Sequence, residues 1–253
     1  MALLDSIETD AREVADLPPL HQLLLWRDPI ARIGREAMAA DEALLEWGGM
    51  SVIRAYAWAR PTVTYGYFDS EQEAQAIFPD SGIDCVRRWT GGGIVDHRAD
   101  IPFSLALRWI DCVGHPTGVE LYRWIHRAVA RVLIDDGVDC LMLADDAPNG
   151  GRACFSSPVT SDLVSSQGYK LAGGGQRRSH QGVLHQGSIQ NCQLSTGWDL
   201  KLAKLLATEV SVSHEVEPYQ GFTQKVDELI VTKYGTSIWN QGGRRRSPQS
   251  TKD

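Results

Sequence analysis

The hydrophobic and polar positions of the chain follow two different periods, which predicts a mixture of helices and strands. Apolar residues recur with helical spacing over 33–47 and again over 118–135, the longest predicted helix. Alternation, or β-branched and aromatic residues, predicts strands over 51–59 and 62–67. The other expected helices are 71–78, 200–208 and 223–233, and the other expected strands are 83–88, 94–97, 102–109, 138–143, 162–166, 169–173 and 182–190.

These elements follow one another without a recognisable linker, which favours a single α+β domain over 35–240. We expect a mixed, largely antiparallel sheet flanked by helices, with 94–97 and 102–109 as a hairpin. The polar segment 1–34 is interrupted by prolines and is expected to form an N-terminal arm. Residues 241–253 include the sequence GGRRR and have the composition of a disordered tail.

Charge and composition narrow the classes of function. The net charge of −7 argues against a general nucleic-acid binder, although a local basic patch would suit an acidic protein partner. No apolar run reaches the roughly 18 residues of a membrane span, and acidic residues near the amino terminus argue against a signal peptide. The five cysteines are odd in number and lack C-x-x-C spacing. This pattern predicts reduced thiols in a cytoplasmic protein without a metal site.

Two glycine clusters carry the candidate chemistry. Residues 87–97 read RRWTGGGIVDH, and residues 170–178 read KLAGGGQRR. Glycine lets a ligand approach the backbone closely, and successive N–H groups can form an anion-binding nest. One interpretation is a shared site for a polar or acyl-carrying ligand; the alternative for either cluster alone is an ordinary glycine-rich turn. The P-loop, G-x-G-x-x-G, G-x-S-x-G and H-E-x-x-H signatures are absent from the sequence.

Residues 87–97 resemble the R-R-x-x-G-G-G-x-V-x-H motif of the lipoate–protein ligase and octanoyltransferase family, which shares its catalytic domain with biotin–protein ligase. Three further segments match the family, and all four have the same order along the chain as in the family. Residues 54–68 resemble R-x-Y-x-W…P-x-x-x-x-G-Y-F, residues 168–178 resemble G-x-K-[LIV]-x-G-[ST]-A-Q-x-R, and residues 183–189 resemble V-L-x-H-G-S-I. By these four matches the chain is identified as a member of the family.

The resemblance implies an α+β fold of the biotin/lipoyl ligase catalytic-domain type, with a tunnel for an eight-carbon acyl chain. Lys170 matches the family lysine that contacts the acyl carbonyl and the leaving group. A lysine beside glycine amides can stabilise the negative charge that develops at a carbonyl oxygen. The substrate-binding residues implied by the motifs are Arg54, Arg87, Arg88, Gly91, Gly92, Gly93, His97, Gly173, Gly174, Gly175, Gln176 and His185.

The sequence departs from the family pattern in three places. Gly174 and Gly175 replace a small hydroxyl residue and an alanine, which is expected to loosen a loop and to remove a hydroxyl donor. Arg98 stands where the family commonly has an acid. Gln186 stands where a second histidine is usual, with His185 shifted by one position. These departures leave the substrate and the activity itself open.

The family divides by the source of the acyl group. Ligases activate free lipoate or octanoate with ATP and Mg²⁺ through an acyl-adenylate, and they often carry an accessory C-terminal domain. Transferases take the group from acyl carrier protein, or from another lipoyl-bearing protein, onto a cysteine and pass it to a lysine of a lipoyl-domain acceptor. Only 65 residues follow Ser188, which leaves little room for an accessory domain.

Cys154 favours the transferase interpretation. Residues 152–158 read RACFSSP and resemble the C-F-x-x-P segment that carries the nucleophile in one octanoyltransferase group. A thiolate is a good acyl acceptor, neighbouring cations such as Lys170 favour it, and exchange between thioesters needs no cofactor. The alternatives are a buried structural cysteine in an ATP-dependent ligase, and a non-catalytic homologue that binds the acyl group or a cofactor.

Overall fold

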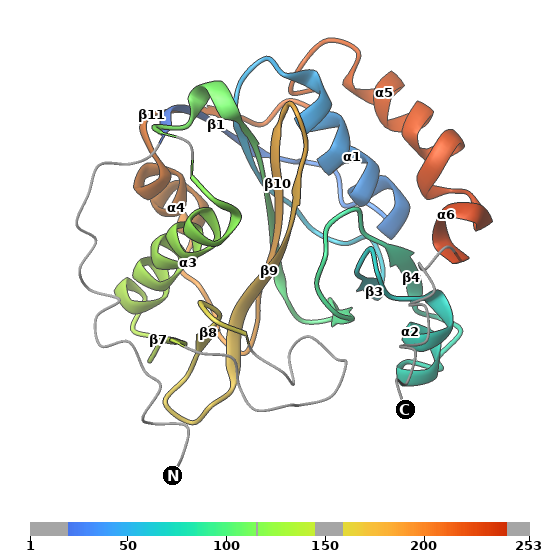
Figure 1. The fold of residues 1–253 in the computed structure, drawn as a ribbon, viewed down its shortest axis with the longest axis horizontal. Helices are drawn as coiled ribbons and strands as arrows, with labels where there is room; N and C mark the ends of the chain where they lie inside the picture. Colours follow the sequence, from blue (N-terminus) through green and yellow to red (C-terminus); the bar gives the residue numbers. More distant parts are fainter. Residues whose placement is uncertain (1–19, 115, 145–158, 242–253) are drawn as a thin grey trace, which may run out of the picture.

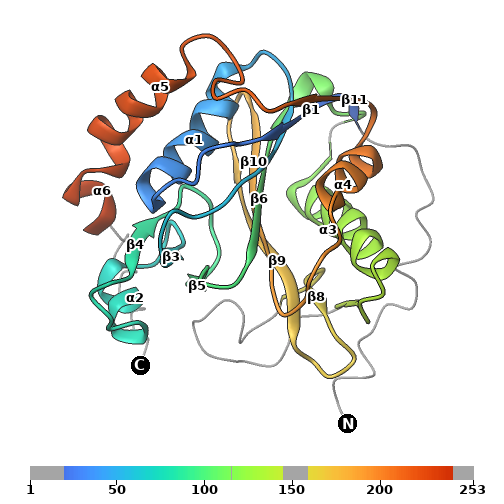
Figure 2. The same cartoon turned by 180° about the vertical axis from the view of Figure 1, so that it is seen from behind.

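The computed structural model describes residues 20–114, 116–144 and 159–241, and within these ranges helices cover both faces of a central sheet. Helices α3 (Gly118–Asp135) and α4 (Trp198–Leu206) lie on one face. Helices α1 (Gly34–Trp47) and α5 (Phe222–Leu229) lie on the other (Figure 1; Figure 2 gives the reverse view). This three-layer arrangement gives each amphipathic helix a sheet face to pack against.

Within the described ranges, the central sheet has eight strands in the order β11-β1-β2-β6-β10-β9-β8-β7. Strand β1 pairs in parallel with both β2 and β11, and the other neighbours are antiparallel. The predicted α+β fold with a mixed, largely antiparallel sheet flanked by helices is therefore confirmed. The strands are β1 (Leu20–Arg27), β2 (Val52–Ala55), β6 (Ile101–Arg108), β7 (Leu141–Met142), β8 (Leu163–Val164), β9 (Lys170–Arg178), β10 (Gly182–Ile189) and β11 (Ala207–Ser213).

A second, three-stranded sheet of the described chain stands beside the first one. Strand β3 (Thr62–Tyr65) lies between β4 (Asp84–Arg87), to which it is parallel, and β5 (Val95–Asp96), to which it is antiparallel. Helix α2 (Glu71–Ile77) packs on this sheet around a small apolar core that includes Val63. The small sheet carries both ends of the first glycine cluster.

Strand β1 corrects the prediction of an N-terminal arm for its residues 20–27. Leu23 and Leu25 pack with α3 and α4, whereas Leu24 and Trp26 pack with α1 and α5. Successive strand residues point to opposite faces, so a strand covered on both faces is a continuous apolar run without alternation. The run LLLW therefore belongs to the core of the sheet.

Three further local expectations change. The hairpin predicted for 94–97 and 102–109 is wrong, because β5 joins the small sheet and β6 joins the large one. The helix expected over 200–208 ends at Leu206, and the chain then continues as β11. The helix expected over 223–233 is α5, followed by a π-helical turn (Ile230–Tyr234) and the short helix α6 (Ser237–Gln241).

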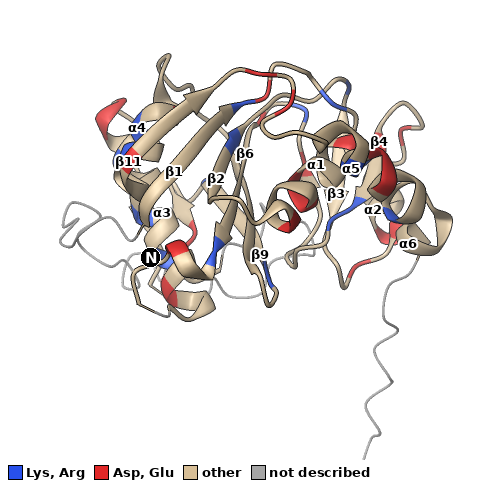
Figure 3. Ribbon diagram, turned by 90° about the horizontal axis from the view of Figure 1, so that it is seen from above, with Lys and Arg blue, Asp and Glu red and all other residues tan. Residues whose placement is uncertain are grey.

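Positively and negatively charged residues are interspersed along the helices, strands and loops (Figure 3). Several of them form surface ion pairs, such as Arg131 with Asp135 on α3 and Lys201 with Asp136. Exposed pairs of this kind contribute little to stability. Among the helices of the described ranges, none combines the length and the apolar character that crossing a membrane requires.

Candidate functional site

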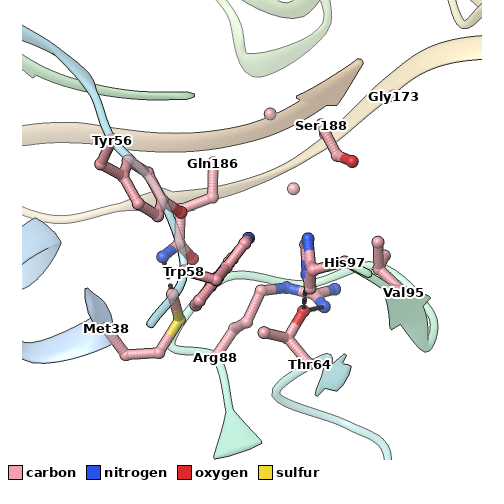
Figure 4. A pocket seen from close by; sticks show the side chains of 13 residues that line it. Met38, Tyr56, Trp58, Thr64, Arg88, Val95, His97, Gly173, Gln186 and Ser188 are labelled. Carbon is pink, nitrogen blue, oxygen red and sulfur yellow. Dashed lines mark hydrogen bonds between the residues drawn. The ribbon is translucent and has the colours of Figure 1, made fainter. Parts of the chain in front are cut away.

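A pocket lies where the small sheet meets β9 and β10 of the large one (Figure 4). Its cavity volume is about 20 Å³, or about 400 Å³ when all the space between the lining atoms, including that open to solvent, is counted. Within the described residues, it brings together segments that are far apart in the sequence, including both glycine-containing motifs. Its lining residues are Met38, Tyr56, Trp58, Thr64, Arg88, Val95, His97, Gly173, Gly174, Gly175, Gln186, Gly187 and Ser188.

Five of the twelve predicted substrate-binding residues line this pocket: Arg88, His97 and the three glycines 173–175. The other seven are described but do not line it. Sequence reasoning did not single out Ser188, or the buried Asp100 to which Ser188 donates a hydrogen bond. Asp100 could have been found from the sequence by its position three residues after His97.

The second glycine cluster lies in strand β9 and not in a loop. Gly173, Gly174 and Gly175 pair in regular register with β10. The expectation that Gly174 and Gly175 loosen a loop is therefore wrong. The strand presents backbone instead of side chains to the pocket, which suits close approach of a ligand or of another backbone.

Neighbouring atoms occupy the space that side chains on these glycines would need. An added Cβ would lie 2.4 Å from the Lys170 Nζ at Gly173, and 2.7 Å from the His185 Nε2 at Gly174. At Gly175 it would lie 2.3 Å from the Gly91 carbonyl oxygen. Because the three glycines lack side chains, the Lys170 amine, the His185 ring and the first glycine cluster can all pack against β9.

Arg88 organises the first glycine cluster. Its guanidinium is buried and donates to the carbonyl oxygens of Gly91 (3.1 Å) and Gly93 (2.8 Å), and to the Thr64 hydroxyl (2.6 Å). Gly92 between them has a φ of 95°, which a residue with a side chain rarely adopts. The carbonyl oxygens of the cluster therefore surround the Arg88 guanidinium, and this guanidinium lies in the pocket wall.

His97 lies at the centre of a hydrogen-bonded chain in the pocket wall. Its Nε2 is 2.7 Å from the Thr64 hydroxyl, and its Nδ1 is 2.5 Å from Asp100 Oδ2. The Asp100 carboxylate can only accept, so Nδ1 carries a proton and donates it; the Thr64 hydroxyl, which accepts from Arg88, can then donate its hydrogen to Nε2. Ser188 donates to the same Asp100 oxygen at 2.6 Å. The imidazole is thereby fixed in orientation, as Figure 4 shows for the Arg88–Thr64–His97 contacts.

Arg54 is part of a buried ion-pair network and not of the pocket lining. It contacts Asp28 and Asp41 at 2.7 Å each, and all three side chains are fully buried. Burial disfavours its charge, but the charges of Asp41 and Asp28 outweigh this and raise the pKa of Arg54. Arg54 shares its strand face with aromatic residues, and its charge is balanced there by buried acids. Its ring neighbour Tyr56, 4.1 Å from the guanidinium carbon, is the residue that reaches the pocket.

Arg87, the other half of the double arginine, points toward the C-terminal helix α6. Its guanidinium donates to the Trp239 carbonyl oxygen at 2.9 Å and to the carbonyl oxygen of Tyr67, and it lies over both rings. Burial lowers the pKa of Arg87. Adjacent strand residues face opposite sides, so only Arg88 can face the pocket.

Lys170 does not itself line the pocket, but a carboxylate holds it next to the pocket-lining Gly173. Its Nζ lies 2.6 Å from Asp162 Oδ2, and both side chains are almost completely buried. The amine also packs against Gly173, which lines the pocket. Cys154 and its neighbour Arg152 lie outside the described residues, so the predicted meeting of Cys154 with Lys170 stays a prediction.

His185 and Gln186 point to opposite faces of β10. Gln186 faces α1, where it donates to Asp41 at 2.7 Å and accepts from the Thr90 hydroxyl at 2.7 Å. His185 faces α3, near Gln176, and is fully buried. Burial, together with the neighbouring His126, lowers the pKa of His185 well below its usual value. A shift by one position along a strand therefore moves a histidine out of the pocket.

The described residues contain no group of three or more His, Cys, Asp or Glu side chains arranged to hold a metal ion.

The comparison with known families identifies the class of the domain. Residues 34–229 match the family model of the lipoyl protein ligase A/B catalytic domain. The chain belongs to this family.

Known relatives fall within the same family. The chain is 32% identical over 178 residues to octanoyltransferase LipM from Carboxydothermus hydrogenoformans, which covers 65% of this chain and 64% of the relative. It is 30% identical over 186 residues to octanoyltransferase LipM from Staphylococcus aureus, which covers 66% of each chain. The matched part thus spans slightly less than two thirds of the length of these relatives.

Solved structures share the fold. A lipoate-protein ligase A bound with ATP superposes with a TM-score of 0.66 and 19% identity, covering 89% of this chain and 99% of that chain. A bi-partite lipoate protein ligase from Thermoplasma acidophilum, described with its E2 lipoyl domain, gives a TM-score of 0.56 and 18% identity, covering 92% and 100%. At these identities the likeness establishes the fold.

Proposed function

We propose that this chain transfers an octanoyl or lipoyl group to a lysine of a lipoyl-domain acceptor, through a thioester on Cys154. The donor is acyl carrier protein or another lipoyl-bearing protein. The observation that carries the proposal is the buried Lys170 amine, held by Asp162 against the pocket-lining Gly173. The names of the relatives that are about 30% identical to the chain support the same reaction.

The pocket suits an apolar chain with a polar end. Met38, Tyr56, Trp58 and Val95 supply apolar surface, and the glycine strand supplies a smooth backbone wall. Each methylene group that leaves water contributes about 0.8 kcal/mol to binding. The cavity of about 20 Å³ is smaller than an eight-carbon chain, so the chain must lie partly in the open part of the pocket or widen it. Each methylene group that it buries against the apolar lining then favours acyl groups over small carboxylates.

The reaction proceeds in two exchanges. The Cys154 thiolate attacks the thioester carbonyl of the donor, the new carbon–sulfur bond forms, and the donor leaves as a thiol after taking up a proton. The acceptor lysine amine then attacks the Cys154 thioester, forms the amide and releases the cysteine thiol with the proton that the amine loses. The Lys170 ammonium stabilises the oxyanion in both steps and favours the Cys154 thiolate. Neither exchange consumes ATP, because the thioester supplies the free energy for the amide.

An open groove beside the pocket offers a place for the protein partners. Groove and pocket share Tyr56, Trp58 and His97 in their walls, and Arg60 and Arg98 line the groove. Acyl carrier and lipoyl domains are typically acidic, so these guanidinium groups favour their approach.

The test is the appearance of an acyl-enzyme. The intact chain is incubated with octanoyl carrier protein and weighed by mass spectrometry, with Cys154→Ala as the test variant and Cys85→Ala as the matched control. We expect an octanoyl adduct that hydroxylamine removes, present in the wild type and in Cys85→Ala and absent in Cys154→Ala. No adduct, together with ATP-dependent acylation of a lipoyl domain, would establish the ligase instead. Octanoate binding without either reaction would establish a non-catalytic homologue.

A further inference from the structure

We propose that Tyr122 is a positioning residue that holds the Lys170 amine in place through Asp162 and through the backbone of Gly174. The inference rests on the proposed acyl transfer, because it assigns Tyr122 a part in that reaction. Tyr122 lies on helix α3, outside every motif of the sequence, where its spacing marks it only as an aromatic residue of a helix.

Asp162 is the link between the lysine and the tyrosine. Its Oδ2 accepts from Lys170 Nζ at 2.6 Å and from the Val159 amide at 2.7 Å. Its Oδ1 accepts from the Tyr122 hydroxyl at 2.6 Å. A lysine amine is a point charge on a flexible chain, so its position depends on the group that holds it. Here that group is itself fixed on both oxygens.

The same tyrosine hydroxyl also holds the pocket strand. It accepts from the Gly174 amide at 3.0 Å. Strand β8 pairs with β9 only as far as Ala172, so within the described residues this edge of β9 has no strand partner at Gly174. An edge amide in the protein interior requires an acceptor, and the Tyr122 hydroxyl provides it. One oxygen atom therefore connects the glycine strand and the carboxylate that binds the lysine.

The Tyr122 ring is held rigidly enough to serve this purpose. Its centroid lies 4.0 Å from that of His126 and 5.6 Å from that of His185. Both imidazole rings are fully buried. Because the ring is packed on these neighbours, its hydroxyl has a defined position. Loss of the hydroxyl alone would leave the packing intact and would release Asp162 Oδ1 and the Gly174 amide together.

The test compares Tyr122→Phe with Tyr219→Phe. Tyr219 donates its hydroxyl to the Ala43 carbonyl oxygen at 3.0 Å and packs with helices α1 and α5, so its variant controls for the loss of a tyrosine hydroxyl. Lysine labelling by an amine-reactive reagent, mapped by peptide mass spectrometry, reports the accessibility of Lys170 without any assumption about activity. Labelling of Lys204 gives the internal reference, because Lys204 is exposed on α4.

We expect Lys170 to be labelled several-fold faster in Tyr122→Phe than in the wild type, and Asp162→Asn to increase the rate further. In octanoyl transfer, kcat of Tyr122→Phe should fall about tenfold or more, while KM for the donor stays within about twofold, because misplacement of a catalytic group affects the transition state. Tyr219→Phe should change neither quantity.

Unchanged Lys170 labelling in Tyr122→Phe overturns the inference, whatever the activity. Faster labelling with an unchanged kcat also overturns it, because the position of Lys170 would then have no bearing on the reaction. If the wild type transfers no octanoyl group, the proposed function fails, and faster labelling still supports Tyr122 as the residue that positions Lys170. Equal melting temperatures of the two phenylalanine variants separate these outcomes from a loss of folding.

Discussion

Replacing Gly175 by alanine is expected to disturb the pocket from its backbone outward. The added Cβ would lie 2.3 Å from the Gly91 carbonyl oxygen and 3.0 Å from the Thr90 hydroxyl oxygen. The first contact is with backbone. Thr90 is fully buried and donates to Gln186 at 2.7 Å, so it cannot move aside freely. An extra methyl group in a well-packed interior costs about 1–3 kcal/mol.

Gly91→Ala is the matched control, because a Cβ on Gly91 would meet no atom within 4 Å. For a chain of this size, about 1–3 kcal/mol corresponds to a melting temperature lowered by roughly 3–10 °C, measured by calorimetry or circular dichroism. Gly175→Ala should show this loss and should bind octanoate more weakly in a calorimetric titration. Gly91→Ala should stay close to the wild type in melting temperature.

Equal melting temperatures for Gly175→Ala and Gly91→Ala would refute the reasoning. They would mean that the first glycine cluster is not packed against β9 as the distances require. The alanine that the family has at this position would then be tolerated here, and no steric reason would remain for a glycine at position 175.

Two further predictions concern buried charge. Burial lowers the pKa of His126 from about 6.5 to about 4, so between these values the unfolded chain binds more protons and stability falls as the pH falls. In urea unfolding, His126 contributes about 2 kcal/mol to the loss of stability from pH 7 to pH 5, and this contribution should disappear in His126→Phe. Arg54→Met leaves Asp41 buried without a cationic partner, while Asp28 keeps only its ion pair with Arg32, and it should cost about 3–5 kcal/mol. Arg131→Met, at the exposed ion pair with Asp135, should cost less than about 1 kcal/mol. Similar losses in these two arginine variants would contradict the assignment of Arg54 to a buried network.

The sequence predicts the family and five of the thirteen residues that line the pocket, because the glycine, arginine and histidine spacings are local. Arg88 and His97 belong to one eleven-residue segment, and both line the pocket as expected. The placement of Arg87 depends on Trp239, about 150 residues further along the chain. No local pattern contains that contact, so the two adjacent arginines look equivalent until the fold separates their faces.

The same distinction explains the other differences. The sequence pattern places residues 20–27 in a polar arm, because a strand buried on both faces lacks the alternation of apolar and polar residues that identifies strands. The link from Lys170 through Asp162 to Tyr122 joins β9, the segment before β8 and helix α3. Each residue alone has an ordinary interpretation as a core or surface residue, and only their packing gives them a common role.

The position of β1 between β2 and β11 also bears on how the chain is made. Gln22 of β1 pairs with Glu209 of β11, so β1 is synthesised long before the strand with which it pairs. Until β11 has left the ribosome, one edge of β1 offers unpaired amide and carbonyl groups next to apolar side chains on both faces. Helix α4, which packs beside β1, directly precedes β11 and arrives with it. During synthesis, this edge is therefore open to aggregation and to capture by chaperones.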